Sequence, residues 1–474
     1  MKSKDVTGER LSHELSGIMA RERVLYRNRD LKAYEYDSTH FRNLPLVIVL
    51  PETTEEVREI VKLARRFNIP VTPRGAGTSL SGGAVPTPGG IMMPLTRMNK
   101  ILEIDIANGI AVVQPGITNK ELQDALKPFR YWFPPDPASL SVATIGGNVA
   151  ENAGGPHCLK YGVTSNHVMG LEVVLPNGDA VNLGGAVEDI PGYDVSGLLT
   201  GSEGTMGIIT SVAVKISRQP EATSTILAIF NSCWDAAVTV FEVIKNGFNP
   251  AVLEMLEERM LHEVNEVFNL GYPDSAKALL IIEVDGRPEG LPFELDGILK
   301  ICRQNKVQVL EVAKNEQERE TLWRARRGGT SALGRLKPDS AEIDIVVPRS
   351  QLPHVVEKFQ EISARNGVIL GALIHAGDGN CHPQVPFDGR IHEEREAAER
   401  ALGEIMQAAV DLGGTISGEH GIGLEKISGM PLVFSPDEIM LMHRLKRLFD
   451  PANMLNPDKI FLAGTPQGKE GSHE

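Results

Sequence analysis

Cysteine is scarce in this sequence, and the few cysteines are far apart. The 474 residues include only Cys158, Cys233, Cys302 and Cys381, with no CxxC pair among them. This spacing argues against a disulfide framework and against an iron–sulfur cluster ligated by this chain. A reducing, cytoplasmic environment suits such a sequence best.

Basic charge and long apolar runs are also missing. The formal net charge is −14, which argues against a nucleic-acid partner because binding to phosphates needs a basic surface. The N-terminus lacks the apolar core of a secretory signal, and the apolar stretch 44–50 is far too short for a bilayer. We therefore expect no transmembrane segment, and any membrane contact would be peripheral and made through a partner.

What is present is the composition of a folded protein long enough for two or three domains. Residues 45–219 alternate short β-rich runs with Gly/Pro turns, beginning with a strand at 46–50 and a helix at 54–67. After residue 220, longer helices alternate with strands, as in an antiparallel sheet with helices on one face. The predicted α+β chain has a lead-in (1–44), a loop-rich domain (45–219), a sheet domain (220–425) and a C-terminal segment (426–474).

The last predicted helix covers residues 437–449. It ends at Asp450-Pro451 because proline cannot continue a helix. Its apolar spacing predicts an inward face made of Ile439, Met442, Leu445 and Leu448.

Three Gly-rich loops fall within the loop-rich domain. The first, 73–79, reads Pro-Arg-Gly-Ala-Gly-Thr-Ser after a strand, and backbone amides in such a loop can point at phosphate oxygens. It is not the Rossmann fingerprint, because Leu80 stands where the third glycine would be. A single loop of this kind is more often a plain turn, but 144–155 and 201–209 have similar compositions. Together the three loops suit a long cofactor with a pyrophosphate, a ribityl chain and a ring.

In this order, the loops resemble the FAD domain of the vanillyl-alcohol oxidase/p-cresol methylhydroxylase superfamily. The resemblance implies a two-part FAD-binding domain of the p-cresol methylhydroxylase type, completed by the C-terminal segment, and a substrate (cap) domain. Some members attach FAD to a histidine of the first loop, and no histidine occurs there in this chain, so non-covalent FAD is implied. The implied FAD contacts are Pro73, Arg74, Gly75, Ala76, Gly77, Thr78, Ser79, Pro137, Ser139, Thr144, Gly146, Gly147, Asn148, Asn152, Gly154, Gly155, Tyr161, Glu203, Gly204, Gly207, Ile208, Ile209 and Asn456.

A histidine cluster marks the sheet domain. In 374–383, an Asp-Gly pair predicts a hairpin that brings His375 and His382 face to face, with Cys381 on the opposite face. A second Gly-rich loop carries Glu419 and His420. Two imidazoles and a carboxylate can hold a divalent metal with open positions, and Zn²⁺, Fe²⁺ and Mn²⁺ are all admissible. The alternative is that both are hydrogen-bonded core histidines. The presence of two histidines across a Gly-rich turn disfavours this alternative.

Both motifs look like the C-terminal domain shared by the glycolate oxidase catalytic subunit, D-lactate dehydrogenases and D-2-hydroxyglutarate dehydrogenases. Segments 155–162 and 448–459 fit the same group, so the resemblance covers almost the whole chain. It implies that His375, His382 and Glu419 bind the metal and that His420 is the catalytic base.

The same resemblance implies an enzyme that oxidises a small D-2-hydroxy acid to the 2-oxo acid. In the implied mechanism, His420 would take the hydroxyl proton of a metal-bound substrate, and the α-hydrogen would pass as hydride to flavin N5. A Trp–Arg–Thr motif of the group matches Arg326 and Thr330 as substrate contacts, and Gln384 matches a further polar contact. The resemblance further implies that His420 contacts the substrate. Arg324 and Arg327 are expected on a solvated helix face.

One departure from the group bears on the substrate. Members acting on 2-hydroxyglutarate carry a lysine for the second carboxylate, and with one inserted residue that place is Glu342 here. A carboxylate would repel a dicarboxylic acid, which favours D-lactate or glycolate, although Lys337 can still intrude. The alternatives are a D-2-hydroxyglutarate dehydrogenase and a non-catalytic FAD electron-relay subunit; the complete histidine cluster disfavours the second. The resemblance implies an electron-accepting partner, either an iron–sulfur subunit or an electron-transfer flavoprotein, or else quinone.

Overall fold

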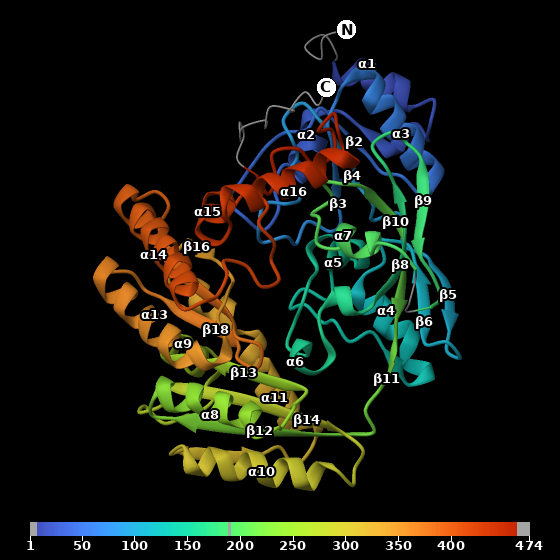
Figure 1. Ribbon diagram of the computed structural model, residues 1–474. Helices are drawn as coiled ribbons and strands as arrows, with labels where there is room; N and C mark the ends of the chain where they lie inside the picture. Colours follow the sequence, from blue (N-terminus) through green and yellow to red (C-terminus); the bar gives the residue numbers. More distant parts are fainter. Residues whose placement is uncertain (1–6, 188–190, 462–474) are drawn as a thin grey trace. The chain divides into compact units, whose positions relative to one another are not determined.

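The computed structural model describes residues 7–187 and 191–461, and the chain divides into two compact units (Figure 1). The first unit contains the chain up to Ala153, Val163–Arg218 and the segment from Glu419 onward. The second contains Gly154–Gly162 and Gln219–Gly418. These bounds differ from the predicted ones at 154–162 and at 419–425, because groups of those segments form hydrogen bonds with residues distant in the sequence. Parts of the predicted lead-in and C-terminal segment lie outside the described residues.

Two sheets form the framework of the first unit. A four-stranded sheet has the order β1-β2-β4-β3, with β2, β4 and β3 parallel. An antiparallel five-stranded sheet has the order β5-β6-β10-β8-β9. The strands are β1 (Val24–Leu25), β2 (Val47–Val49), β3 (Val71–Arg74), β4 (Ile91–Pro94), β5 (Ile101–Asp105), β6 (Ile110–Val113), β8 (Val168–Val174), β9 (Ala180–Gly184) and β10 (Ile208–Lys215), with β7 (Tyr131–Trp132) paired to β11 (Ser217–Arg218).

The helices of the first unit begin as their caps require. The helix predicted at 54–67 is α3 (Thr54–Phe67), where the Thr53 hydroxyl accepts from the amide of Glu56. The other helices are α1 (Gly8–Leu15), α2 (Asn28–Leu31), α4 (Asn119–Leu126), α5 (Ile145–Glu151), α7 (Val195–Leu199), α15 (Met430–Val433) and α16 (Pro436–Phe449).

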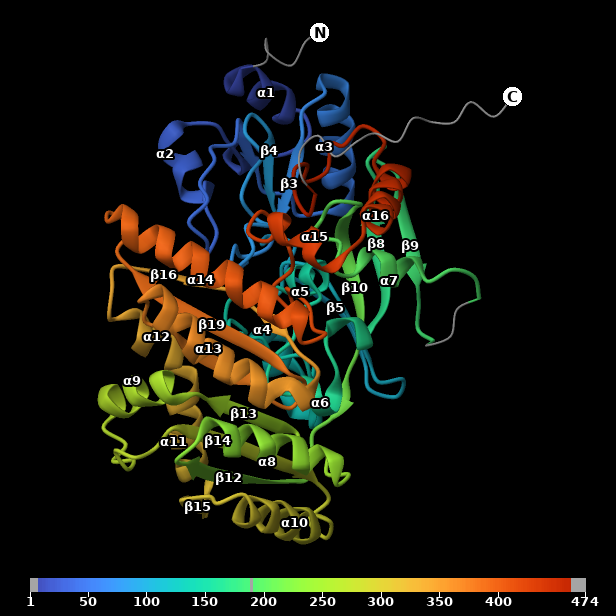
Figure 2. The ribbon, with the colours of Figure 1, turned by 60° about the vertical axis from the view of Figure 1, so that its left-hand side comes forward.

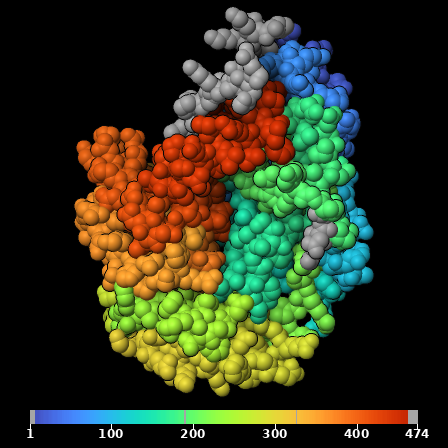
Figure 3. Space-filling view, in the orientation of Figure 1, coloured from blue at the N-terminus to red at the C-terminus, as the bar shows by residue number. Residues whose placement is uncertain are grey.

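The buried face of α16 differs from the predicted one. Leu448 is 77% exposed, whereas Lys446 is buried. The ammonium of Lys446 donates to the carbonyls of Thr205 and Leu455 and to the Asp450 carboxylate, which compensates its burial. Figure 3 shows the red C-terminal part of the first unit next to a green stretch of the same unit.

One antiparallel sheet forms the centre of the second unit. Its strand order is β15-β12-β14-β13-β18-β19-β16, and β17 also pairs with β19. The strands are β12 (Ala222–Phe230), β13 (Val252–Leu256), β14 (Ala278–Gly286), β15 (Val309–Val312), β16 (Asp339–Glu342), β17 (Ile345–Val346), β18 (Gly371–His375) and β19 (Asn380–Phe387). The helices are α6 (Cys158–Tyr161), α8 (Cys233–Lys245), α9 (Glu258–Phe268), α10 (Leu291–Gln304), α11 (Glu316–Arg327), α12 (Gly329–Gly334), α13 (Leu352–Asn366) and α14 (His392–Asp411).

The sheet is antiparallel as predicted, but helices cover both of its faces instead of one. Residues of α8, α10, α13 and α14 form the core on one face, while α9 and α12 pack on the other (Figure 2). The reason is visible in β12, where residues 226–230 are all apolar. Successive side chains point to opposite faces, so an unbroken apolar run needs cover on both. Over residues 7–187 and 191–461, no helix is both long and apolar enough to cross a membrane.

The buried carboxyl of Glu257, at the start of α9, should make the stability of the protein depend on pH. Burial raises its pKa to about 7 from an ordinary value of 4.5. The folded protein holds this proton above the pH at which the unfolded chain releases it, so stability falls between these two values. The free energy of unfolding of E257Q should therefore rise relative to that of wild type by up to about 3 kcal/mol between pH 4.5 and pH 7. Above pH 7 the difference should stay constant. Denaturation midpoints across this pH range measure the difference. Glu266, exposed on the same helix, provides the control, E266Q, and a difference between E257Q and wild type that does not vary with pH would contradict the assignment.

Candidate functional site

The first Gly-rich loop closes around the guanidinium of Arg74. This side chain is buried and donates to the carbonyls of Tyr36 and Ala84, at 2.6 and 3.1 Å. Gly77 has φ +79°, and a Cβ there would lie within 1.9 Å of the guanidinium. Glycine is therefore required both by the backbone conformation and by the space that Arg74 fills.

The second loop lies against the first. Thr144 caps α5 by accepting from the Gly147 amide at 3.2 Å, and a Cβ on Gly75 would lie 2.5 Å from the Thr144 hydroxyl. A Cβ on Gly146 would meet Pro115 at 2.4 Å. The buried side-chain amide nitrogen of Asn148 has no hydrogen-bond partner among the described residues. The two loops thus form a cradle so closely packed that side chains at Gly75 and Gly146 would not fit. The buried amide nitrogen of Asn148 can still donate a hydrogen bond. Both features fit a bound FAD.

The third loop completes this arrangement. The amide of Glu203 donates to the Ala150 carbonyl of α5 at 2.8 Å, and a Cβ on Gly204 would lie 2.6 Å from Pro73. Asn456, from the C-terminal segment, donates to the carbonyls of Gly83 and Glu203 at 2.9 and 2.8 Å. Four predicted cofactor residues from three segments, Pro73, Glu203, Gly204 and Asn456, are therefore neighbours in the first unit.

The carboxylate of Glu203 also holds the loop that follows His420. It accepts from the amides of Ile422 and Gly423 at 2.7 and 2.8 Å. Burial raises the pKa of Glu203, and burial together with the charge of Glu203 raises the pKa of Glu151. These contacts explain why the chain rejoins the first unit directly at Glu419 and not near residue 426.

The segment 154–162 is anchored to the second unit instead. Its Tyr161 hydroxyl donates to Asp285 at 2.7 Å, and Lys160 pairs with the same carboxylate at 2.5 Å. His157 stacks on Trp323 with ring centroids 6.3 Å apart. Tyr161 is also one of the implied FAD contacts, and that contact stays a prediction.

The predicted histidine hairpin is present in the second unit. The strands β18 and β19 pair Leu373 with His382 and His375 with Asn380. Both histidines are buried, and their rings are 5.0 Å apart at 84°. Cys381 belongs to the apolar core of the opposite face, as expected.

A buried glutamate that sequence reasoning missed lies beside this pair. Glu254 of β13 is 0% exposed, and its Oε1 lies 2.6 Å from Nδ1 of His375. Its Oε2 accepts from Nε of Arg326 at 2.5 Å. Burial acts to raise the pKa of Glu254, but the charges of Arg326 and His375 lower it to about 2. The one signal in the sequence is an acidic residue inside an otherwise apolar strand, Val-Leu-Glu-Met-Leu.

The predicted substrate contacts gather on the same unit. Arg326 is buried, while Arg324 and Arg327 are exposed as expected. The side-chain amide of Gln384 donates to the hydroxyl of Ser340 at 2.8 Å and to the carbonyl of Thr330 at 3.4 Å. Its buried oxygen has no partner among the described residues.

Glu342 lies close to the histidine pair, unlike Lys337. The Oε1 of Glu342 is 3.9 Å from Nδ1 of His382, and Glu342 pairs with Gln384 in the register of β16 and β19. Lys337 forms an ion pair with Glu394 at 2.9 Å. The ammonium of Lys337 is thus paired with Glu394 and not with the histidine pair.

The Glu419–His420 dipeptide follows a residue that is fixed beside the hairpin. The amide of Gly418 donates to Asp344 at 2.6 Å, and a Cβ on Gly418 would lie 2.6 Å from the side chain of Asn380. Asn380 is the strand partner of His375. Glu419 comes one peptide bond later, and its Oε1 is 3.9 Å from Nε2 of His420.

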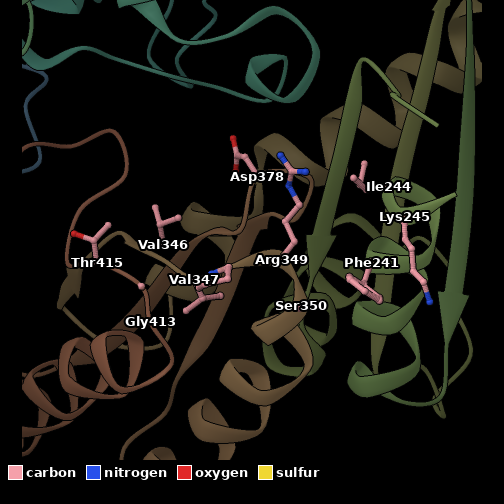
Figure 4. Close-up of a pocket in the computed structure, with 12 residues that line it drawn as sticks. Phe241, Ile244, Lys245, Val346, Val347, Arg349, Ser350, Asp378, Gly413 and Thr415 are labelled. Carbon is pink, nitrogen blue, oxygen red and sulfur yellow. The ribbon is translucent and has the colours of Figure 1, made fainter. Parts of the chain in front are cut away.

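A hollow of about 730 Å³ on the second unit contains none of the predicted site residues. It is lined by residues of α8, by 346–350, by Asp378 and by 413–415 (Figure 4). Asp378 of the hairpin turn therefore lines the hollow, but neither His375 nor His382 does.

Comparisons with known proteins identify the relationship. The model for the FAD binding domain matches residues 45–184, and the model for the C-terminal domain of FAD linked oxidases matches residues 219–460. The chain belongs to the FAD-linked oxidase family. It is accordingly an FAD-dependent oxidoreductase, and the expected cofactor FAD is confirmed at the level of the family.

Relatives of this FAD-linked oxidase cover nearly its full length. It is 41% identical to the glycolate oxidase subunit GlcD of Bacillus subtilis over 90% of this chain and 92% of that protein. It is 35% identical to a D-lactate dehydrogenase of Archaeoglobus fulgidus over 90% of this chain and 95% of that protein. The structure of p-cresol methylhydroxylase with substrate bound matches with a TM-score of 0.80 at 18% identity, covering 96% of this chain and 97% of the other. The predicted fold type is therefore confirmed.

The cradle predicts the effect of adding one methyl group. In G75A, the new Cβ would meet the hydroxyl that caps α5, so the two loops must separate. Overpacking of this kind costs about 1–3 kcal/mol, so we expect FAD affinity to fall about 5- to 150-fold. The flavin-to-protein absorbance ratio after dialysis measures it. In the control G185A, a Cβ meets nothing within 4 Å, and equal flavin loss in both variants would contradict the cradle.

Proposed function

We propose that this FAD-linked oxidase oxidises a small D-2-hydroxy acid, D-lactate or glycolate, to the 2-oxo acid and passes the electrons to a partner protein. The proposal rests mainly on the buried pair His375 and His382 on one face of the sheet. Glu254 contacts His375 and also accepts a hydrogen bond from Arg326, so the arginine lies at the same face. A metal-binding donor set beside a buried guanidinium suits a substrate with a hydroxyl and a carboxylate on neighbouring carbons.

The proposed metal ligands are His375, His382 and Glu419. Two imidazoles and a carboxylate fit Zn²⁺, Fe²⁺ or Mn²⁺, and the contact of Nδ1 of His375 with Glu254 makes Nε2 its metal-binding atom. A divalent ion held there would lower the pKa of the substrate hydroxyl. Glu342, 3.9 Å from His382, adds negative charge to the same region.

His420 is proposed as the general base. An imidazole that is neutral near pH 7 can take the proton from the hydroxyl oxygen of the substrate. The amides after His420 are held by Glu203, which fixes the backbone that carries the base. FAD, when bound without a covalent link in the first unit, supplies the two-electron acceptor for the α-hydrogen.

Arg326, Thr330 and Gln384 are proposed to hold the substrate. Nε of Arg326 is occupied by Glu254, so its two terminal amino groups are the ones that can face a carboxylate. The buried oxygen of Gln384 can accept a hydrogen bond from a hydroxyl. Glu342 beside this group would repel a second carboxylate, which disfavours 2-hydroxyglutarate.

The electron acceptor is proposed to be another protein. The relative in Bacillus subtilis is a subunit of glycolate oxidase, and this chain has no CxxC pair that would suggest a cluster of its own. An iron–sulfur subunit or an electron-transfer flavoprotein would accept the electrons.

Anaerobic flavin reduction tests the substrate assignment. Purified protein is mixed with D-lactate, L-lactate, glycolate and D-2-hydroxyglutarate, and flavin bleaching is recorded. D-lactate or glycolate should bleach the flavin fastest, and E342Q should raise the rate with D-2-hydroxyglutarate relative to D-lactate by about tenfold, because a repelling charge is removed. Bleaching of wild type by D-2-hydroxyglutarate alone would show that the role of Glu342 is misassigned.

Substitution of His420 tests the base. H420A should slow flavin reduction by about 10²–10⁴-fold at unchanged FAD content. The exposed His392 on α14 gives the control H392A, which should react like wild type. Unchanged reduction in H420A would remove this residue from the mechanism.

A further inference from the structure

Glu254 occupies a position that the sheet register dictates. In the pairing of β13 with β18, Glu254 is directly opposite His375. Side chains opposite each other in antiparallel strands lie about 5 Å apart at Cβ and point to the same face. The observed 2.6 Å contact between Oε1 and Nδ1 therefore follows from strand pairing, not from a flexible loop.

The second oxygen of Glu254 reaches a different element. Nε of Arg326 on α11 donates to Oε2 at 2.5 Å. Glu254 is 0% exposed and Arg326 is 6% exposed, so water does not screen this pair effectively. One buried carboxylate thus joins a histidine on the sheet to an arginine on the covering helix.

We propose that Glu254 is a positioning residue that fixes the metal-binding tautomer of His375 and, through the same carboxylate, the orientation of the substrate-binding Arg326. This inference rests on the proposed function and adds to it a residue that couples the metal to the substrate carboxylate. A carboxylate that accepts the Nδ1 proton of a histidine leaves Nε2 as the ligand atom and makes it more basic. The bond to Nε fixes the plane of the Arg326 guanidinium, whose terminal amino groups offer further donors for a carboxylate.

A simpler role for Glu254 would be the neutralisation of a buried arginine. The chain contains an example of that role in Glu283 on β14. Its carboxylate accepts from Arg319 of the same helix α11 at 2.8 and 3.0 Å, and from Trp323 at 3.1 Å. Thr225 also donates to it at 2.8 Å. Glu283 and Glu254 are thus both buried strand carboxylates that accept from an arginine of α11. Glu283 has additional donors in Trp323 and Thr225, whereas Glu254 has the contact with His375.

This match provides the experiment. E254Q and E283Q are prepared as full-length holoproteins, and the affinity for Zn²⁺ is measured by competition with a chromophoric chelator. Outer-shell partners of metal-binding histidines typically contribute 10–100-fold in affinity, so E254Q should bind Zn²⁺ about 10–100-fold more weakly, whereas E283Q should stay within about twofold of wild type. In anaerobic reduction, E254Q should also require a higher D-lactate or glycolate concentration for half-maximal rate.

The outcomes separate this inference from the proposed function. Equal Zn²⁺ affinity in wild type and E254Q would overturn the role of Glu254 and leave the proposed oxidation intact. An equal loss of Zn²⁺ affinity in E254Q and E283Q would show that Glu254 only neutralises a buried arginine, and would overturn the proposal. Wild type that binds no divalent ion would overturn both. If E254Q does not fold, E254D decides: the shorter carboxylate keeps the charge but not the reach to both partners, so wild-type affinity in E254D would contradict the proposal.

Discussion

The tight turn between β18 and β19 is the constraint on which the candidate site of the second unit depends. Gly379 in this turn has φ +86°, and a Cβ there would lie 2.2 Å from the carbonyl oxygen of Val347. Only glycine meets both conditions. The turn sets the register that places His375 and His382 on one face. A slip by one residue would send a strand's side chains to the opposite face, into the apolar core under α8, α10, α13 and α14.

The face that carries the histidines also carries a row of buried acids across neighbouring strands. Asp285 pairs with Lys160, Glu283 with Arg319 and Glu254 with Arg326. Buried carboxylates are tolerated only when they are paired, so each acid fixes a cation from the chain that covers this face. Two of these cations belong to α11, and this anchoring is what holds Arg326 in reach of the histidine strand. The polar row therefore links the packing of a helix to the geometry of a proposed catalytic site.

Local patterns in the sequence predicted much of this arrangement. The bounds of α3, the histidine hairpin and the clustering of the Gly-rich loops depend on neighbouring residues, and these predictions are confirmed. The buried Lys446, the second covered sheet face and the attachment of 154–162 to Asp285 were missed. The second covered face is indicated by the local apolar run 226–230. The other two depend instead on partners distant in the sequence, such as Lys160 and Asp285, 125 residues apart. Glu254 was missed for the same reason, because its role appears only once β13 is paired with β18.

The central claim is that a divalent ion on the histidine face activates the substrate hydroxyl while FAD accepts the hydride. The most direct measurement removes the ion with a chelator, verifies that FAD content is unchanged, and records anaerobic flavin bleaching by D-lactate or glycolate. We predict that bleaching is lost in the metal-free protein and returns when Zn²⁺ or Mn²⁺ is added back. Bleaching at the full rate by protein that contains no measurable metal would contradict the account.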